Sequence, residues 1–370
     1  TRPGSAQRWT TSGMIGFMCG ILAFCLKQTI ASILYLRETM LNAIMDTDGD
    51  TSLMENGWRS DWLWQTYVVL IIFTSSLVVL SSAVILYGEP RAAGSGIPET
   101  SAFLNGVIIP KTFTISVVIA KFASCALAVG SGIPAGPEGP MIHMGSVLGS
   151  LVSQGVFMPK FMKDFLKPFH NVCDRRDFMG AGVAGGVAAA FSAPIGGLLF
   201  VAEEIATHWD VELGMQIFFC AIVACSTVEV LMSSFTTFIY IGGLGAIKEK
   251  SAILFAVNKE ISVNVIMFIP TIILGIIGGL FGVVFNKISV GASAFRAKHI
   301  KPHKIMFLLE PVLVAIVYCS AIIFIPTFFD CVPIDCSEDP ELAACARVGL
   351  SGLDDESVIG YGCPADKYNP

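Results

Sequence analysis

Long apolar runs dominate the pattern of hydrophobic and polar positions along this chain. An α-helix needs about 20 apolar residues to cross a bilayer, and six runs are long enough to do so. Three of them carry no charged residue: Trp62–Tyr87, Phe178–Ala202 and Ile261–Asn286. Three others carry one each: Trp9–Leu36, Leu213–Ile241 and Ile305–Phe329. The pattern therefore predicts an all-α polytopic membrane protein.

Composition supports this prediction. Of the 370 residues, 54% are hydrophobic and 14% are charged, whereas a soluble domain carries about 25% charged residues. Too few polar side chains are present to cover a water-facing surface. Soluble enzymes, nucleic-acid binders and secreted disulfide modules are therefore excluded, and the chain has no basic stripe that could follow phosphates.

The charges between the runs predict a topology. The linker Asn286–Lys304 contains five lysines and arginines and no acid, and Lys160–Asp177 has a net charge of +2. By the positive-inside rule both linkers and the amino terminus face the cytoplasm. The segments 46–61 and 330–370 are acidic, and we expect them on the opposite side.

The last segment also contains a group of four cysteines. On an extracellular or lumenal side they favour one or two disulfides, with three possible connectivities. Zinc binding is the competing interpretation, but no histidine accompanies them. Because the chain starts at Thr1 and stops in a polar loop, we expect it to be a fragment of a longer protein. The cysteines are Cys331, Cys336, Cys345 and Cys363.

Four Gly- and Pro-rich breaks interrupt the apolar sequence in the middle of the chain. Each is expected to begin a helix, with proline in the first turn. A helix that begins inside a membrane exposes N–H groups and its positive dipole end, which together can hold an anion. The breaks are Gly94–Pro98, Gly130–Pro134, Gly136–Pro140 and Ala193–Gly197.

Acidic residues within apolar sequence are further candidates, because an intramembrane carboxylate is costly unless it is paired or hydrated. Glu138 lies in the third break and could compete with an anion for the same N–H groups. Glu203 and Glu204 are adjacent, so we expect only one to face the protein interior. Glu229 and Glu310 stand alone in the sequence and are weaker candidates.

At these residues the sequence resembles the CLC family of chloride channels and chloride/proton exchangers, and most closely its endosomal–lysosomal exchanger branch. The resemblance runs from the first apolar segment to the end of the chain. It is carried by GSGIPE at Gly94–Glu99, LNGV at Leu104–Val107, GPEGPMIHMG at Gly136–Gly145, RRDF at Arg175–Phe178 and AAAFSAPIGGLLFVAEE at Ala188–Glu204.

The resemblance implies roles for single residues. The Ser95 hydroxyl would coordinate the central anion, Glu138 would be the gating glutamate, and Glu204 would be the internal proton-transfer glutamate. Serine at this position is similar to the chloride-preferring members. The implied anion-binding set is Ser95, Gly96, Ile97, Gly136, Pro137, Glu138 and Gly139.

Pro137 stands where the family usually has Lys or Arg, which removes a positive charge and an N–H group. The second GSGIP, at Gly130–Pro134, lies outside the family pattern and is assigned no site. His143 follows the gating motif, and we expect it to be a packed neighbour rather than a proton relay. The family's coordinating tyrosine belongs to a region beyond this chain.

As a whole, the resemblance implies a CLC-type fold of inverted repeats with broken, partly re-entrant helices. Residues 1–329 would form the first repeat and the start of the second, and residues 330–370 a Cys-rich lumenal or extracellular loop. The remaining transmembrane half and any nucleotide-binding CBS domains would lie outside the chain.

The implied function is voltage-dependent chloride/proton antiport, with a passive voltage-gated chloride channel as the alternative. We expect chloride, protons and membrane lipid as partners, a homodimer, and an endosomal, lysosomal or other acidic-organelle membrane. No cofactor, metal or nucleic acid is expected. An enzyme is not expected either, because the sequence contains no HExxH or GxSxG motif.

Overall fold

The computed structural model describes residues 5–45, 60–156, 159–206, 209–239, 265–325, 328, 332–333 and 367–368. Within these residues, five helices are long and apolar enough to cross a membrane: Ala6–Leu41, Trp64–Gly88, Val211–Ser234, Val265–Ile300 and Lys304–Phe324. They correspond to five of the six predicted runs. The sixth, Phe178–Ala202, is divided between two helices that meet at a sharp corner.

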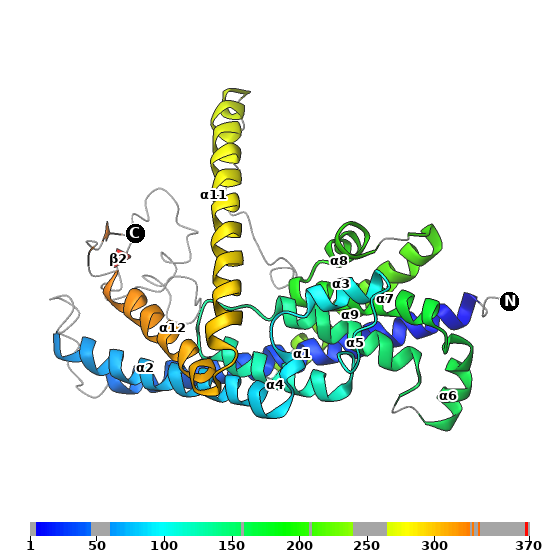
Figure 1. Cartoon of the computed structure of the whole chain (residues 1–370), viewed down its shortest axis with the longest axis horizontal. Coiled ribbons are helices and arrows are strands. Elements are labelled where there is room, and N and C mark those ends of the chain that lie inside the picture. Colours follow the sequence, from blue (N-terminus) through cyan, green and yellow to red (C-terminus); the bar gives the residue numbers. More distant parts are fainter. Residues whose placement is uncertain are drawn as a thin grey trace.

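Figure 1 shows the described elements as an almost entirely helical assembly. The fold class is therefore confirmed, with one two-residue strand pair as the exception. The elements are α1 (Ser5–Met45), α2 (Ser60–Ala83), η3 (Val84–Gly88), η4 (Pro90–Ala92), α3 (Ile97–Leu104), α4 (Ile115–Gly130), α5 (Glu138–Ser153), α6 (Lys160–Leu166), η5 (Lys167–Phe169), α7 (Val172–Phe191), α8 (Pro194–Phe200), η6 (Val201–Ile205), α9 (Val211–Ile239), η7 (Val265–Met267), α11 (Phe268–Phe295), η8 (Arg296–Ile300), α12 (Lys304–Phe324), β1 (Val332–Pro333) and β2 (Lys367–Tyr368).

The core is built on backbone contact between α5 and α7. The two helices are antiparallel: Gly145 lies against the backbone of Gly182, and Gly149 against that of Phe178. A methyl group on Gly145 or on Gly182 would collide with the carbonyl oxygen of the other residue. Small residues let membrane helices approach this closely, so that van der Waals packing and backbone contact hold them together.

Helices α1 and α9 run parallel to each other along the side of this pair. Gly16 of α1 lies against the carbonyl of Cys220, and Gly20 lies against Thr227, about two turns further along α9. The thiol of Cys220 in turn donates to the carbonyl of Ala181 in α7, with 3.2 Å between sulfur and oxygen. The three helices α1, α7 and α9 therefore share one interior.

One end of this interior is closed by a polar network around Arg8. The Arg8 guanidinium is ion-paired with Asp174, and its Nη2 lies 2.6 Å from Oδ2 of Asp177. Its Nε donates to Oε1 of Gln216 at 3.1 Å. Because the network joins the first turns of α1, α7 and α9, these helices begin at the same end of the molecule. This agrees with the predicted placement of the amino terminus and the linker before α7 on one side.

A second group consists of α2, α4 and α12. The Tyr67 hydroxyl of α2 lies 2.8 Å from the Ser320 hydroxyl of α12. Thr74 donates to the carbonyl of Ser131 at the end of α4, and Ser81 to that of Ser124. Helix α2 is thus antiparallel to α4.

Helix α11 stands away from the other helices (Figure 1) and has no buried residue. Together with η8 it continues to Ile300, so most of the expected linker Asn286–Lys304 is helical.

At the end of the chain, Val332 pairs with Tyr368 and Pro333 with Lys367 in the antiparallel strands β1 and β2. The acidic segment 46–59 and the four clustered cysteines, Cys331, Cys336, Cys345 and Cys363, lie outside the described residues. The disulfide prediction therefore stays a prediction.

The backbone contact between α5 and α7 predicts a strong effect of a small substitution. Gly182→Ala should lower the yield and the melting temperature of the detergent-purified protein, because overpacking of this kind costs about 1–3 kcal/mol. Gly88→Ala is the matched control, since a Cβ at Gly88 meets no atom within 4 Å. Equal melting temperatures for the two variants would contradict the proposed importance of this contact.

Candidate functional site

The first break contains a turn that only glycine adopts easily. Gly96 has a φ of 82° and caps the amino terminus of α3, which begins at Ile97 with Pro98 in its first turn. The Ser95 hydroxyl accepts a hydrogen bond from the backbone N–H of Ile97, with 3.3 Å between the atoms. The break at Gly94–Pro98 therefore begins a helix, as predicted, and Ser95 lies at its positive end.

The third break begins α5, also as predicted. Glu138 is the first residue of the helix, and Pro137 precedes it as the cap. The carboxylate of Glu138 folds back over Gly136, where a methyl group would collide with it. Pro137 and Pro140 bring no N–H group to this helix start, so Gly139 supplies one of the few backbone donors there.

These two breaks lie side by side. A Cβ built on Gly139 would be 2.8 Å from the Cβ of Ser95. One turn further along the same face of α5, the ring of His143 lies directly against the Cα of Gly96. Residues 136–139 and 95–97, separated by some forty residues in the sequence, therefore form one site, which we call the anion loop pair.

Lys121 of α4 supports this pair from the protein interior. Its side chain is 1% exposed, and its Nζ donates to the carbonyl oxygens of Gly94 and Ser95 at 3.1 and 3.2 Å. The sequence reasoning missed this residue. The available signal was a single lysine in the otherwise apolar helix Ile115–Gly130, because an intramembrane cation is a functional candidate by default.

Hydroxyl groups fix the other side of the loop. Thr100 donates to the carbonyl of Gly96 at 2.8 Å, and its hydroxyl lies 3.3 Å from that of Ser146 in α5. Helix α3 is therefore tied both to its own start and to α5. Two helix amino termini and a buried lysine now surround one short stretch of backbone, and all three favour a negative ligand.

His143 is fully buried between these elements. Its ring packs edge-on against Phe113, with 5.6 Å between the centroids. Neither ring nitrogen makes a hydrogen bond to any of the described residues. His143 is thus the packed neighbour that the sequence predicted, and its bulk occupies the space beside Gly96.

The second break differs from the prediction. Gly130–Pro134 ends α4 instead of beginning a helix, and the next helix starts only at Glu138. Gly132 has a φ of 83° and its N–H bonds to the carbonyl of Val129, which is a helix-terminating turn. The fourth break begins α8 at Pro194, as predicted.

Glu203 and Glu204 lie in η6, directly after α8. Both are exposed in the described part of the chain, so the expectation that one of them is buried is wrong. Segment η6 lies against α3 and α7. The structure therefore places the segment that carries Glu204 beside the helix that begins at Ile97.

The two weaker candidates, Glu229 and Glu310, both have partners in the structure. Glu310 is ion-paired with Arg296, whose Nε lies 2.5 Å from Oε1. Glu229 accepts a hydrogen bond from the Ser192 hydroxyl at 3.1 Å. Neither lies in the anion loop pair.

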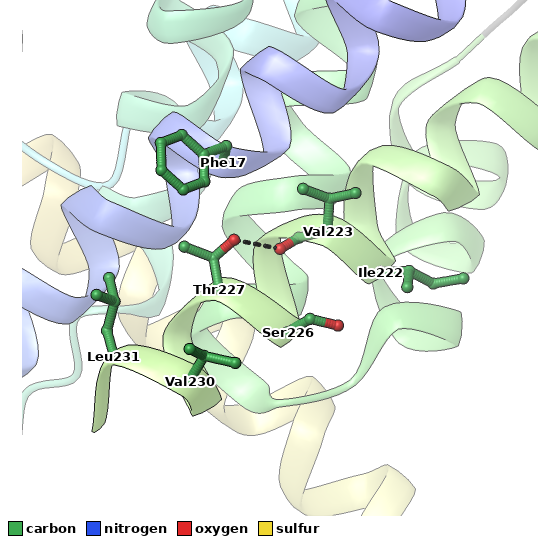
Figure 2. Close-up of a pocket in the computed structure, with 7 residues that line it drawn as sticks. All are labelled: Phe17, Ile222, Val223, Ser226, Thr227, Val230 and Leu231. Atoms are coloured by element: carbon green, nitrogen blue, oxygen red, sulfur yellow. Dashed lines mark hydrogen bonds between the residues drawn. The ribbon is translucent and has the colours of Figure 1, made fainter. Parts of the chain in front are cut away.

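A separate apolar pocket lies where α1 meets α9. Figure 2 shows Phe17 facing α9 across it, and the Thr227 hydroxyl bonded to the carbonyl of Val223. The pocket has no charged lining residue and is therefore no candidate for anion binding. Its lining consists of Phe17, Ile222, Val223, Ser226, Thr227, Val230 and Leu231.

The contact between Gly96 and His143 predicts a compensating pair of substitutions. Gly96→Ala alone should lower the melting temperature of the detergent-purified protein, because the new methyl group collides with the imidazole. Gly96→Ala combined with His143→Ala should recover part of this loss, since the collision is gone and the strain of a positive φ, about 1 kcal/mol, and the cavity left by the imidazole remain. No recovery in a well-folded double variant would contradict the assignment of this contact.

Comparison with known proteins now places the chain in a family. The family model described as voltage gated chloride channel matches residues 76–334. Chloride channel protein D of Dictyostelium discoideum is 35% identical over 329 residues, which cover 88% of this chain and 30% of that protein. H(+)/Cl(-) exchange transporter 7 of Bos taurus is 31% identical over 378 residues, which cover 98% of this chain and 45% of that protein. The chain thus spans less than half the length of these relatives.

Two solved structures share the fold. A slow cyanobacterial Cl-/H+ antiporter has a TM-score of 0.62 at 18% identity, covering 85% of this chain and 64% of its own. A eukaryotic CLC transporter has a TM-score of 0.64 at 19% identity, covering 88% of this chain and 52% of its own. With more than half of its residues matched by the family model, the chain belongs to the CLC family of voltage-gated chloride channels and transporters.

Proposed function

We propose that the protein carrying this chain exchanges chloride for protons across a membrane. The observation that carries the proposal is the meeting of the Ser95 loop with the start of α5, supported by the buried Lys121. The relative from Bos taurus is named as an exchange transporter of these two ions, which supports the same conclusion. Voltage dependence is part of the proposal.

Glu138 is the proposed gate. Its carboxylate lies at the first residue of α5, where the helix amino terminus stabilises negative charge. A chloride ion and the ionised carboxylate would therefore compete for the same backbone donors. When Glu138 binds a proton, it loses its charge and leaves the donors of residues 136–139 and 95–97 to the anion.

Glu204 is the proposed internal proton donor and acceptor. It is exposed at the end of the α8–η6 segment, where it can exchange protons with water. Segment η6 lies against α3, so that one short helix lies between Glu204 and the anion loop pair. No metal or cofactor enters this scheme.

The remaining proposals concern the whole protein. We infer that a further transmembrane half completes the anion path, because the relatives are more than twice as long as the matched region. Residues 1–329 are then the first repeat and the start of the second, and 330–370 a lumenal loop. A homodimer in an acidic organelle, with nucleotide binding only in additional cytoplasmic domains, is the proposed assembly.

A passive chloride channel is the alternative function. It is favoured by the name of the Dictyostelium discoideum relative, chloride channel protein D. The two functions differ in whether protons move against their gradient when chloride flows.

The first test uses the full-length protein in liposomes with a chloride gradient. The wild type should drive uphill proton movement, which Glu204→Ala abolishes while chloride flux continues. Glu203→Ala is the matched control, because Glu203 is also exposed on the same segment, and it should retain proton movement. Chloride flux without coupled protons in the wild type would overturn exchange in favour of a channel.

A second prediction concerns the gate. Glu138→Ala removes the competing carboxylate, so its chloride flux should continue without coupled protons and should depend less on pH than the flux of the wild type. Flux measured at several pH values checks this. A variant that keeps the pH dependence of the wild type would exclude Glu138 as the gate.

A further inference from the structure

A second polar cluster lies inside the helical assembly, at the end of α7. The hydroxyl of Ser192, at the end of α7, donates to Oε1 of Glu229 in α9 at 3.1 Å. Lys27 of α1 lies within electrostatic range of the same carboxylate. Cys225, one turn before Glu229 on the same face of α9, is the other titratable group beside it. All four side chains are half-buried.

The position of this cluster in the membrane makes it unusual. Lys27 lies within the apolar span Ala6–Leu41, and Glu229 within the span Val211–Ser234. Charged side chains at such positions are costly, and those that occur are paired and connected to function. A third element, the end of α7, supplies a hydroxyl to the Glu229 carboxylate.

Ser192 itself has a strained backbone. Its φ is 53°, in the left-handed region where a helix usually ends with glycine. Because serine has a Cβ, this conformation is unfavourable for it unless a side-chain contact offsets the strain. The hydrogen bond to Glu229 is that contact, since it fixes the hydroxyl at the point where the chain reverses direction.

The reversal determines where α8 lies. Helix α8 begins at Pro194, two residues after Ser192, and is only seven residues long before η6 follows. Gly197 packs directly on the carbonyl of Ala184 in α7, so α8 has little freedom to move sideways. The orientation of the corner at Ser192 is therefore transmitted along α8 to Glu204.

We propose that Glu229, Ser192 and Lys27 form an intramembrane positioning site, in which the Glu229 carboxylate holds the α7–α8 corner and thereby sets the position of Glu204 against α3. Lys27 offsets the negative charge of this carboxylate, and the carboxylate accepts the hydrogen bond from Ser192. The inference rests on the proposed exchange for its effect on transport, but its effect on the corner is independent of transport.

The direct test is hydrogen–deuterium exchange of the backbone amides between residues 193 and 205. Glu229→Leu and Ser192→Ala should each speed this exchange about tenfold, the effect expected for losing a hydrogen bond to a charged group. Exchange in α5 should stay unchanged. Ser192→Gly is the safeguard against misfolding, because it relieves the backbone strain and still removes the hydroxyl. Unchanged exchange in Ser192→Gly and Glu229→Leu would overturn the inference.

The transport test uses the same variants in liposomes. Glu229→Leu and Ser192→Ala should lower the number of protons moved per chloride about fivefold or more, with chloride flux close to wild type. A fivefold change is within the range by which a substitution outside two sites alters the coupling between them. The double variant Lys27→Met/Glu229→Gln keeps an acceptor for Ser192 without charges and should restore coupling. Glu310→Gln is the matched control, because Glu310 is paired with Arg296 outside the cluster.

The outcomes separate the two proposals. If the wild type moves chloride but no protons, exchange fails, while the deuterium experiment still decides the positioning role. If the wild type exchanges both ions and Glu229→Leu keeps its coupling ratio, the positioning role fails and the exchange proposal stands.

Discussion

Direct backbone contact between α5 and α7 is the constraint on which the rest of the described structure depends. Gly145 and Gly182 allow the carbonyl of each helix to lie where a side chain would otherwise stand. Without this contact, α5 could not present Gly139 and His143 to the loop at residues 95–97. The glycine-rich sequence of α7 therefore affects the site indirectly, because it determines how closely α5 packs on α7 and thus where the start of α5 lies.

A helix that begins inside a membrane favours negative charge at its amino terminus. In this structure a nearby lysine strengthens that preference. The starts of α3 and α5 meet at Ser95 and Gly139, and Lys121 neutralises the two carbonyl oxygens that would oppose an anion there. The ammonium group accordingly does two things: it satisfies the backbone of residues 94–95, and it contributes positive charge to the same place. A neutral residue at this position could not supply the positive charge.

Much of this arrangement could be predicted from the sequence, because apolar run length and Gly/Pro breaks report directly on membrane helices. The limits are equally physical. The same five residues, GSGIP, begin α3 at one place and end α4 at another, although Gly96 and Gly132 have nearly the same positive φ, so this pentapeptide alone does not determine whether a helix begins. Lys121 stands out in the sequence as the one charged residue of an apolar helix, but its acceptors are backbone atoms, so the sequence does not show where it binds. The partners of Glu229 and Glu310 were missed because each contact depends on tertiary packing: Ser192 is 37 residues from Glu229.

In the proposed exchanger, α3 is the element shared by both ions. It lies against α5, α7 and η6, so the gate at Glu138 and the proton carrier Glu204 border the same eight-residue helix. Thr100 ties that helix to the carbonyl of Gly96 and to Ser146, which leaves it little freedom to tilt. Coupling between chloride and protons then needs no large rearrangement, because a movement of the Glu138 or the Glu204 side chain acts on the same rigid helix, α3. The positions of α5 and of the α7–α8 corner would set how strongly that shift is transmitted.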